Sequence, residues 1–407
     1  MLSERKEIMF EIKGQINTAI CYASVVEEKA IEQIRRICDY EFTRDSKIRI
    51  MPDVHAGKGC TIGTTMTVVD KVVPNIVGVD IGCGMYTVNL GKIDVDFEKL
   101  DAAAHFIPSG MNIWKGRQER FNLQELHCYR SLKNTKWLER SLGTLGGGNH
   151  FIEVNQAQDG TKYLVIHTGS RNLGKQVAEL YQQLAVDLNK GKETYFQQRD
   201  EIIRSYKEQG RKKEIQAALE AISWNKREAT IPEDLCHLYG SFFENYMHDI
   251  EICQHFAKRN REKIAEILLS RTGMTGTDAF HTIHNYIDTK EMILRKGAIA
   301  AHKGEKVLIP INMKDGSILA VGKGKLEWNY SAPHGAGRIM SRTKAKNELS
   351  LEEYKNVMKG VYTTSVNENT LDEAPMAYKS LNDIIDVIQE SVDVIEVLKP
   401  IYNFKAN

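Results

Sequence analysis

The stretch Val79-Asp80-Ile81-Gly82-Cys83-Gly84 sets an acid and a thiol three residues apart, each followed within two residues by a glycine. Glycine lets the backbone turn sharply or approach a ligand closely. The flanking residues, 75–77 and 85–88, have the composition of buried strands. The pattern therefore predicts that Asp80 and Cys83 lie at a rigid junction between strand and loop. A core cysteine and a turn aspartate are the plain alternative to a functional pair.

Four histidines further along the chain give this stretch its weight. His150, His167, His284 and His334 each stand in a separate segment that is marked by glycine or asparagine. The first three begin or end a β-type run, so we expect their side chains to have fixed directions. A core histidine in a glycine-rich turn would explain any one segment alone. Several such segments in one chain favour a shared site.

Composition restricts the class of protein. The chain has 407 residues, with 55 Lys+Arg against 54 Asp+Glu and a net charge of +1. This balance excludes a globally basic nucleic-acid coat, so contacts with nucleic acid must come from a local patch. No apolar run approaches the roughly 18 residues of a membrane span, and the first eight residues lack the apolar region of a signal peptide. Seven cysteines without a CxxC motif argue against a disulfide framework and a zinc ribbon. We therefore expect a cytoplasmic protein.

The local patterns predict a chain that alternates between helix and strand. Helices are expected over 26–42, after residue 171, over about 195–269 as a helical insertion, and over 350–360 and 381–398. Strands are expected over 47–52, in short runs between 60 and 90, over 151–154 and 163–166 around a turn at 159–160, and between 279 and 310. Because the motifs spread from 53 to 405, we expect one integrated catalytic domain, residues 1–407.

The site residues suggest a metal centre. One carboxylate, one thiol and three imidazoles come from Asp80, Cys83, His150, His167 and His284. This is more than one tetrahedral zinc ion needs, but a thiolate can bridge two cations. One ion would then take Asp80, Cys83 and His150, and the other Cys83, His167 and His284. Ligand type alone allows Mn, Zn, Fe or Co, and two close divalent ions suit phosphate chemistry.

The fourth histidine, His334, lies in a locally basic segment, 323–346. The small residues 335–337 would let phosphates approach backbone amides, and Arg338 supplies a fork for phosphate oxygens. A histidine among such groups is open to three roles: metal ligand, general base or nucleophile. The residues alone thus predict a dinuclear metal enzyme that acts on a phosphate.

Six motifs together resemble those of the RtcB-type RNA ligases, and they occur in the family's order over nearly the whole chain. The motifs are Pro52-Asp-Val-His-Ala-Gly-Lys-Gly59, Val79-Asp-Ile-Gly-Cys-Gly84, Gly148-Asn-His-Phe-Ile-Glu153, His167-Thr-Gly-Ser-Arg171, His284-Asn-Tyr286 and His334-Gly-Ala-Gly-Arg-Ile-Met-Ser-Arg342.

The resemblance implies a single α/β domain in which mixed β-sheets form a core wrapped by helices. It implies GTP- and Mn(II)-dependent joining of an RNA 3′-phosphate or 2′,3′-cyclic phosphate to a 5′-hydroxyl, with two Mn(II) ions per active site. The reaction would pass through a histidine–GMP intermediate and a guanylylated RNA 3′ end, in tRNA splicing or RNA repair. An activator of the archease type is the protein partner that the resemblance suggests.

The resemblance also implies a role for each site residue. His334 would take GMP, with Asp53 orienting it, and the five metal-type residues would bind manganese in the two groups given above. Nucleotide contacts would come from Asn149, Glu153, Ser317, Ala336, Gly337, Tyr378 and Lys405. Contacts to RNA or triphosphate oxygens would come from Arg171, Arg338 and Arg342.

Two departures from the family pattern concern the pocket and the RNA more than the chemistry. Many members carry Gly-Ser-Met-Gly where this chain has Ile311-Asn312-Met313-Lys314, and the basic segment after the first metal motif is reduced to Lys115, Arg117 and Arg120. An enzyme that only caps or processes 3′-phosphate ends is the nearest alternative. An RNA-binding protein that holds metal without turnover is a second, and the retained His334 argues against it.

Overall fold

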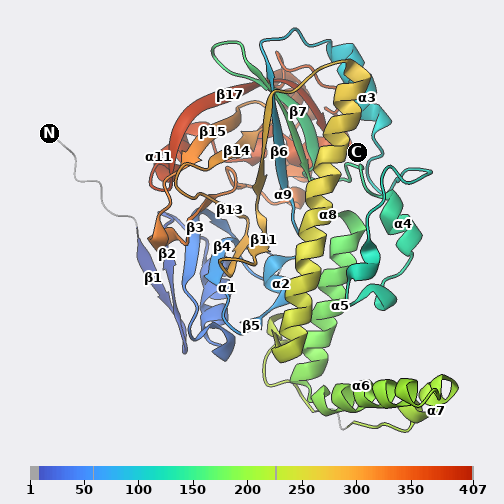
Figure 1. Cartoon of the computed structure of the whole chain (residues 1–407). Coiled ribbons are helices and arrows are strands. Elements are labelled where there is room, and N and C mark those ends of the chain that lie inside the picture. Colours follow the sequence, from blue (N-terminus) through green and yellow to red (C-terminus); the bar gives the residue numbers. More distant parts are fainter. Residues whose placement is uncertain (1–8, 58, 225–226, 406–407) are drawn as a thin grey trace.

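The computed structural model describes residues 9–57, 59–224 and 227–405. The expectation about the first eight residues, and position 58 of the first motif, lie outside this part of the chain. The structure is a mixed α/β fold with several sheets, as the sequence predicts (Figure 1). Its description as one domain of residues 1–407 stays a prediction.

The larger sheet has seven strands, and every neighbouring pair in it is antiparallel. Its order is β10 (Asp278–Ile283), β6 (Gly84–Gly91), β8 (Lys162–Thr168), β7 (Phe151–Gln156), β17 (Val392–Lys405), β15 (Gly316–Gly322) and β14 (Lys306–Asn312). The two edge strands approach each other, because the Leu308 amide of β14 donates to the Thr282 hydroxyl of β10 at 3.1 Å. The sheet is therefore nearly closed on itself.

A second sheet of six strands contains the only parallel pair among the named strands, β2 with β3. Its order is β1 (Phe10–Lys13), β2 (Thr18–Cys21), β3 (Ile48–His55), β4 (Ile62–Thr67), β12 (Ile293–Lys296) and β11 (Asn285–Asp288). Two short pairs complete the strands: β13 (Ala298–Ala300) with β16 (Ser331–Pro333), and β5 (Lys71–Val72) with β9 (Leu238–Tyr239).

The long helix α8 (Gly240–Thr272) runs beside the larger sheet with α5 (Arg171–Asn189) next to it (Figure 1). Ile264 and Leu268 of α8 pack against Val88 of β6 and Leu164 of β8 in one apolar cluster. Each fully buried aliphatic side chain of this kind contributes about 1.5–3 kcal/mol relative to an exposed one. α8 is thus fixed against the strands that carry the site.

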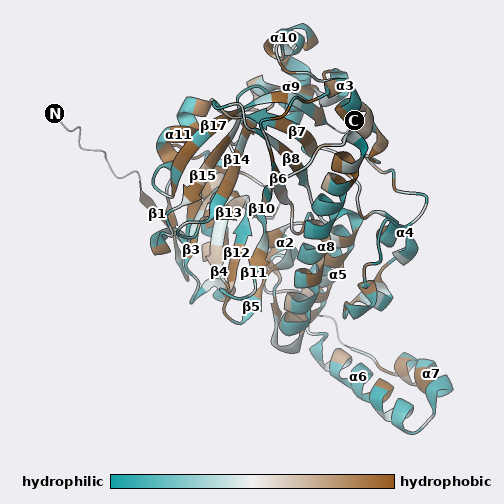
Figure 2. Ribbon diagram, turned by 45° about the horizontal axis from the view of Figure 1, so that its top comes forward, coloured by the Kyte–Doolittle hydropathy of each residue, from teal (hydrophilic) through white to brown (hydrophobic). Residues whose placement is uncertain are grey.

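The remaining α-helices are shorter than α5 and α8. They are α1 (Glu28–Cys38), α2 (Pro74–Val77), α3 (Phe97–Phe106), α4 (Thr135–Arg140), α6 (Glu193–Glu208), α7 (Ile215–Glu220), α9 (Arg342–Glu348), α10 (Leu351–Val357) and α11 (Leu381–Ile388). α6 and α7 project from the body in both views, and α6 is largely hydrophilic in colour (Figures 1 and 2). Whether this segment is an insertion into one domain stays a prediction.

Three predictions of secondary structure are wrong in whole or in part. The stretch 195–269, expected as helix, is interrupted between α7 and α8, where the structure has the short strand β9. Residues 75–77, expected as a strand, belong to the short helix α2, which begins with Pro74 at a position where a proline's missing amide costs nothing. Residues 392–398, expected as helix, belong to β17. That stretch is rich in β-branched residues and pairs with β15, and the rest of β17 pairs with β7. Pro400 lies inside β17 beside a shift in register, and bulges of this kind are where a sheet accommodates proline.

Other predictions are confirmed. The turn at 159–160 joins β7 and β8 into an antiparallel hairpin, and Met85–Val88 lie in β6. Within the described parts of the chain, no helix combines the length and apolarity that crossing a membrane requires.

Candidate active site

Glycines allow the Asp80–Cys83 loop to lie between α8 and β10. Gly82 has φ +73, and a Cβ there would come within 2.9 Å of the Ala257 Cβ on α8. A Cβ on Gly84 would come within 2.4 Å of the Thr282 carbonyl oxygen on β10. Any larger residue at these two positions would push the loop off its neighbours. The glycines therefore place Cys83 in the interior of the protein, immediately before the first residue of β6.

The register of the larger sheet brings the other site residues to Cys83. His167 pairs with Met85 of β6 on one side and with Phe151 of β7 on the other. The backbone amide of His284, which follows β10, donates to the Cys83 carbonyl at 2.9 Å. Residues from four separate segments therefore meet at one end of the sheet.

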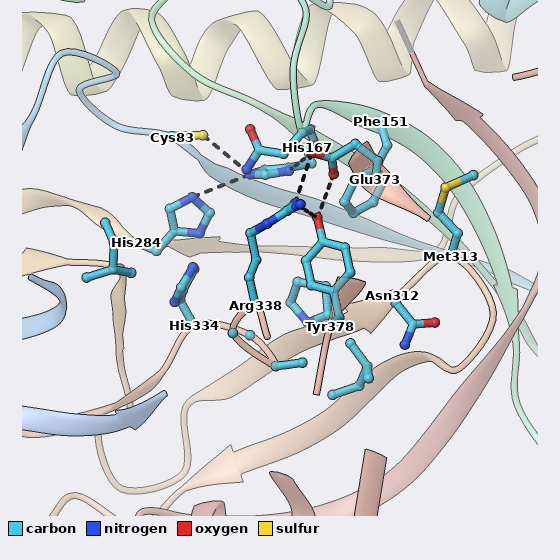
Figure 3. Close-up of a pocket in the computed structure, with 18 of the residues that line it drawn as sticks. Cys83, Phe151, His167, His284, Asn312, Met313, His334, Arg338, Glu373 and Tyr378 are labelled. Atoms are coloured by element: carbon cyan, nitrogen blue, oxygen red, sulfur yellow. Dashed lines mark hydrogen bonds and ion pairs between the residues drawn. The ribbon is translucent and has the colours of Figure 1, made fainter. Parts of the chain in front are cut away.

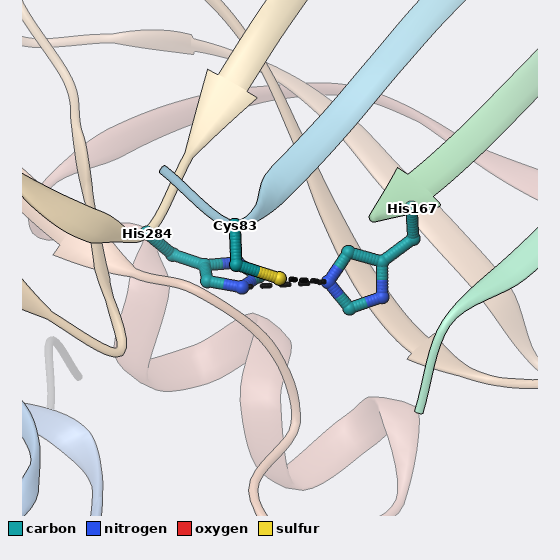
Figure 4. Close-up of side chains that lie close together, drawn as sticks. All are labelled: Cys83, His167 and His284. Atoms are coloured by element: carbon teal, nitrogen blue, oxygen red, sulfur yellow. Dashed lines mark hydrogen bonds between the residues drawn. The ribbon is translucent and has the colours of Figure 1, made fainter. Parts of the chain in front are cut away.

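Two groups of possible metal ligands share the Cys83 sulfur. In the first, His150 Nε2 lies 3.0 Å from Asp80 Oδ2 and 3.5 Å from Cys83 Sγ. In the second, His167 Nε2 lies 3.3 Å from Cys83 Sγ and 3.4 Å from His284 Nε2 (Figure 4). The structure thus brings together the five residues in the two groups that ligand chemistry suggests.

Two of the imidazoles are oriented by backbone carbonyls. His150 Nδ1 lies 2.9 Å from the Leu145 carbonyl oxygen, and His167 Nδ1 lies 3.1 Å from that of Asn149. A proton on Nδ1 makes these hydrogen bonds and leaves each Nε2 lone pair directed at Cys83. Metal-binding histidines are usually held in this way. The donor set therefore fits one or two divalent cations.

Burial controls the charge of these groups. It lowers the pKa of His167 and of His284 well below the ordinary value, so both rings are neutral and can ligate a cation. Burial alone would raise the pKa of Asp80, but its contacts with His150 and Cys83 and the charge of Arg171 together outweigh burial and lower that pKa to about 2. Burial and the charge of Asp80 raise the pKa of Cys83 well above its usual value. A bound cation would reverse this, since a coordinating thiol is deprotonated.

His334 lies beside the second group. Its ring centroid is 5.0 Å from that of His284, and its Nδ1 lies 2.7 Å from Oδ2 of Asp53 on β3. Asp53 is buried, at 1% exposure. Gly337, at φ +72, lets the loop after His334 pass close to Asp53, where a Cβ would lie 3.2 Å from its carbonyl oxygen. With Nδ1 engaged, the other ring nitrogen of His334 remains for chemistry.

A cavity of about 380 Å³ opens beside these residues (Figure 3). Its walls include most of the residues singled out from the sequence: Asp80, Cys83, Asn149, Glu153, His167, His284, His334, Ala336, Gly337, Arg338, Arg342, Tyr378 and Lys405. The remaining four do not line it: Asp53, His150, Arg171 and Ser317. Asp53 stands behind His334, and Ser317 is fully buried behind its neighbour Gly316, which does line the cavity.

Glu153 lies on the cavity wall with both carboxylate oxygens held. Asn155 donates to Oε1 at 2.8 Å. Asn403 of β17, which lies opposite Glu153 of β7 in the sheet, donates to Oε2 at 2.6 Å. Burial nevertheless raises the pKa of Glu153 to about 7, against the pull of those two amides. Asn403 also lines the cavity, and the sequence analysis did not single it out.

Glu373 is a second residue of the cavity wall that sequence reasoning missed. It accepts from Tyr378 at 2.7 Å and from Lys405 at 2.9 Å, and it pairs with Arg342 and Arg338. Burial alone would raise its pKa, but these cations, Lys405 above all, hold it at about 2. No local motif marks Glu373, because its partners come from segments up to 35 residues away.

The arginines expected to bind phosphate already have partners in the structure. Arg342 pairs with Asp372 and Glu373, and Arg338 donates to the Asp372 carbonyl and the Tyr378 hydroxyl. Arg171 lies apart from the cavity and donates to the Gly110 carbonyl at 3.0 Å. The basic segment 323–346 is therefore neutralised in large part by acidic neighbours. Its free positive charge is smaller than the sequence suggests.

The departure from the family pattern also lies in this wall. Ile311, Asn312 and Met313 line the cavity, whereas Lys314 donates to the Lys359 carbonyl at 2.7 Å. Asn312 holds the turn by accepting from the amides of Lys314 and Asp315. Three of the four residues at the position of Gly-Ser-Met-Gly therefore form part of the cavity wall, and Lys314 does not.

Comparison with known proteins gives a consistent answer. The family model "tRNA-splicing ligase RtcB" matches residues 33–131 and 118–406. The RNA-splicing ligase RtcB of Escherichia coli is 28% identical over 397 residues, which cover 87% of this chain and 88% of that protein. The tRNA-splicing ligases RtcB of Archaeoglobus fulgidus and Aeropyrum pernix are 28% and 26% identical, covering 90% and 83% of this chain and 88% and 83% of those proteins. The chain therefore belongs to the RtcB family of RNA ligases.

Proposed function

We propose that this chain joins RNA 3′-phosphate or 2′,3′-cyclic phosphate ends to 5′-hydroxyl ends in a reaction that uses GTP and Mn(II). The observation that carries the proposal is the position of His334. It lies between a buried acid, Asp53, and the second metal-type group, on the wall of a cavity. RNA binding alone has no need of a histidine held in this way.

His334 is the proposed nucleophile. Its free ring nitrogen attacks the α-phosphorus of GTP, a P–N bond forms, and the bond to the β-phosphate breaks to release pyrophosphate. The proton on Nδ1 stays on the ring, hydrogen-bonded to Asp53 at 2.7 Å. That carboxylate fixes the tautomer and stabilises the positive charge that develops on the imidazole.

Two further steps complete the reaction. An oxygen of the RNA 3′-phosphate attacks the same phosphorus, and the P–N bond breaks to regenerate His334. The 5′-hydroxyl of the second RNA then attacks the 3′-phosphate, loses its proton and displaces GMP. A 2′,3′-cyclic phosphate must first be hydrolysed to a 3′-phosphate. Mn(II), held by the five-residue site, would neutralise phosphate oxygens and orient the attacks.

The cavity is the proposed guanosine site. Glu153, held by two amides, can accept hydrogen bonds from the ring N–H and amino group of guanine, which adenine does not offer in that arrangement. Lys405 and Tyr378, both fixed by Glu373, stand on the same cavity wall. The arginines of this wall would exchange part of their acidic partners for phosphate oxygens.

The test is incubation of the protein with α-labelled GTP and Mn(II), followed by denaturing gel electrophoresis. We expect a labelled protein band that needs Mn(II). RNA with a 3′-phosphate should then chase the label onto its end, and a 5′-hydroxyl RNA should convert that product to a ligated strand. No labelled protein would contradict the proposal. Guanylylated RNA ends that never join would instead support the end-capping alternative.

A further inference from the structure

The middle of α8 carries two adjacent polar side chains that are fully buried. Asn260 and Arg261 each have an exposure of 0%. They lie in the stretch 195–269, which the sequence analysis predicted to be helical and to which it assigned no chemical role. Burying a guanidinium is costly unless hydrogen bonds offset the loss of water, so the partners of Arg261 indicate its role.

Asn260 uses both ends of its amide. Its oxygen accepts from the backbone amides of Gly143 and Thr144 at 2.7 and 3.1 Å. Its nitrogen donates to the carbonyls of Thr144 and Gly169, each at 3.1 Å. The residue therefore ties the glycine-rich loop that leads to His150 to the turn that follows His167.

Arg261 makes a parallel connection. Its Nη1 donates to the Gly82 carbonyl at 2.6 Å and to the Thr168 carbonyl at 2.8 Å. Gly82 precedes Cys83, and Thr168 follows His167. The Gly82 amide in turn donates to the Asn285 carbonyl at 2.6 Å, which connects the segment of His284. Nη2 of Arg261 is buried without a hydrogen-bond partner within the described chain. The hydrogen bonds of Arg261 therefore offset only part of the cost of burying its guanidinium.

One turn of α8 therefore holds the backbone of three loops directly, those of Cys83, His150 and His167, and the segment of His284 through Gly82. The bonds go to residues next to these ligands and not to the ligand atoms. Because Cys83 belongs to both groups, a shift of Gly82 relative to Thr168 would change the distances within both. Such outer contacts orient ligands and affect metal affinity.

We propose that Asn260 and Arg261 are positioning residues that set the geometry of the two-cation site by clamping its loops together. The inference rests on the proposed metal-binding function. It predicts that weakening the clamp lowers metal affinity in a protein that is still folded.

The experiment titrates the full chain with Co(II) alone, and follows the absorption of the thiolate–cobalt bond together with the bound metal per chain. The variants are Arg261→Met, which removes both hydrogen bonds that Nη1 donates, and Asn260→Ser. Asp249→Asn is the matched control. Asp249 is also fully buried on α8, and it accepts from the amides of His127 and Cys128 and from the Tyr181 hydroxyl, away from the cavity.

We expect both clamp variants to bind Co(II) about 10- to 100-fold more weakly than wild type, with a changed thiolate–cobalt spectrum. Asp249→Asn should lose thermal stability and keep its cobalt affinity, which separates positioning from a general loss of stability. Circular dichroism at the titration temperature establishes which variants are folded, and one folded clamp variant suffices. Affinities within about two-fold of wild type in a folded clamp variant would overturn the proposal.

Failure of the metal site itself gives a different result. A wild type that binds no Co(II), or binds it equally well after Cys83→Ala, would overturn the metal-binding function and the clamp together. Normal thiolate-dependent binding in wild type and in the clamp variants would overturn the clamp alone.

Discussion

At the scale of single residues, Glu153 is the group whose charge should govern nucleotide binding. Burial raises its pKa to about 7, so the ionised form that accepts two hydrogen bonds from guanine increases between about pH 6 and pH 8. We expect GTP affinity to rise over this range, and GTP to be preferred over ATP by about 100-fold or more, because the wrong base leaves buried polar groups unpaired. Glu153→Gln should bind GTP about 10- to 100-fold more weakly without pH dependence. Equal use of ATP by wild type would contradict the assignment.

Cys83 is the residue on which both metal-type groups depend. Its sulfur lies 3.5 Å from His150 Nε2 and 3.3 Å from His167 Nε2. We expect Cys83→Ala to lose both metal ions in elemental analysis, whereas His150→Ala and His284→Ala should each lose mainly one. Cys60→Ala is the control, since Cys60 is also buried, its thiol donates to the Thr64 hydroxyl, and it belongs to neither group of possible metal ligands. Two ions at full occupancy in Cys83→Ala would show that the sulfur does not bridge them.

At the scale of elements, the local residue pattern predicted strands and helices correctly where it fits only one type of secondary structure. β6 and the β7–β8 hairpin follow their alternation and turn signals. β17 does not, because its apolar residues also suit a helix face and only pairing with β7 and β15 selects the strand. α2 was missed for a related reason, since four residues give no helical period to read.

The short 3₁₀ helix Glu368–Glu373 ends in the acid that organises the pocket wall. Because the pKa of Glu373 is lowered to about 2 from an ordinary 4.5, its ionised form stabilises the fold. This contribution is fully present above about pH 5.5 and is lost as the pH falls toward 2; from the shift it is worth roughly 3 kcal/mol. Chemical denaturation should show Glu373→Gln destabilised by about this amount near pH 7, with the difference shrinking toward pH 3. A difference independent of pH would contradict the charge-based account.

At the scale of the whole molecule, the site joins segments from β3 to β17 that sequence order separates by hundreds of residues. The two groups of possible metal ligands could be predicted from the sequence, and the structure places their side chains together, because thiol, carboxylate and imidazole chemistry allows few arrangements. Glu373, Asn403 and the contacts of Asn260 and Arg261 could not, because each depends on which distant side chains or backbone groups the fold brings within 3 Å. The acidic partners of Arg338 and Arg342 were hidden for the same reason.

The central claim is that His334 carries GMP during ligation, and one comparison tests it most directly. His334→Ala and wild type are each given 3′-phosphate RNA with GTP and Mn(II), or RNA with a preformed guanylylated 3′ end, together with a 5′-hydroxyl RNA. We predict that His334→Ala, folded and metal-loaded, forms no covalent GMP adduct and joins no 3′-phosphate RNA, yet joins the preformed guanylylated end. An adduct of undiminished yield in His334→Ala would place the nucleophile elsewhere and contradict the account.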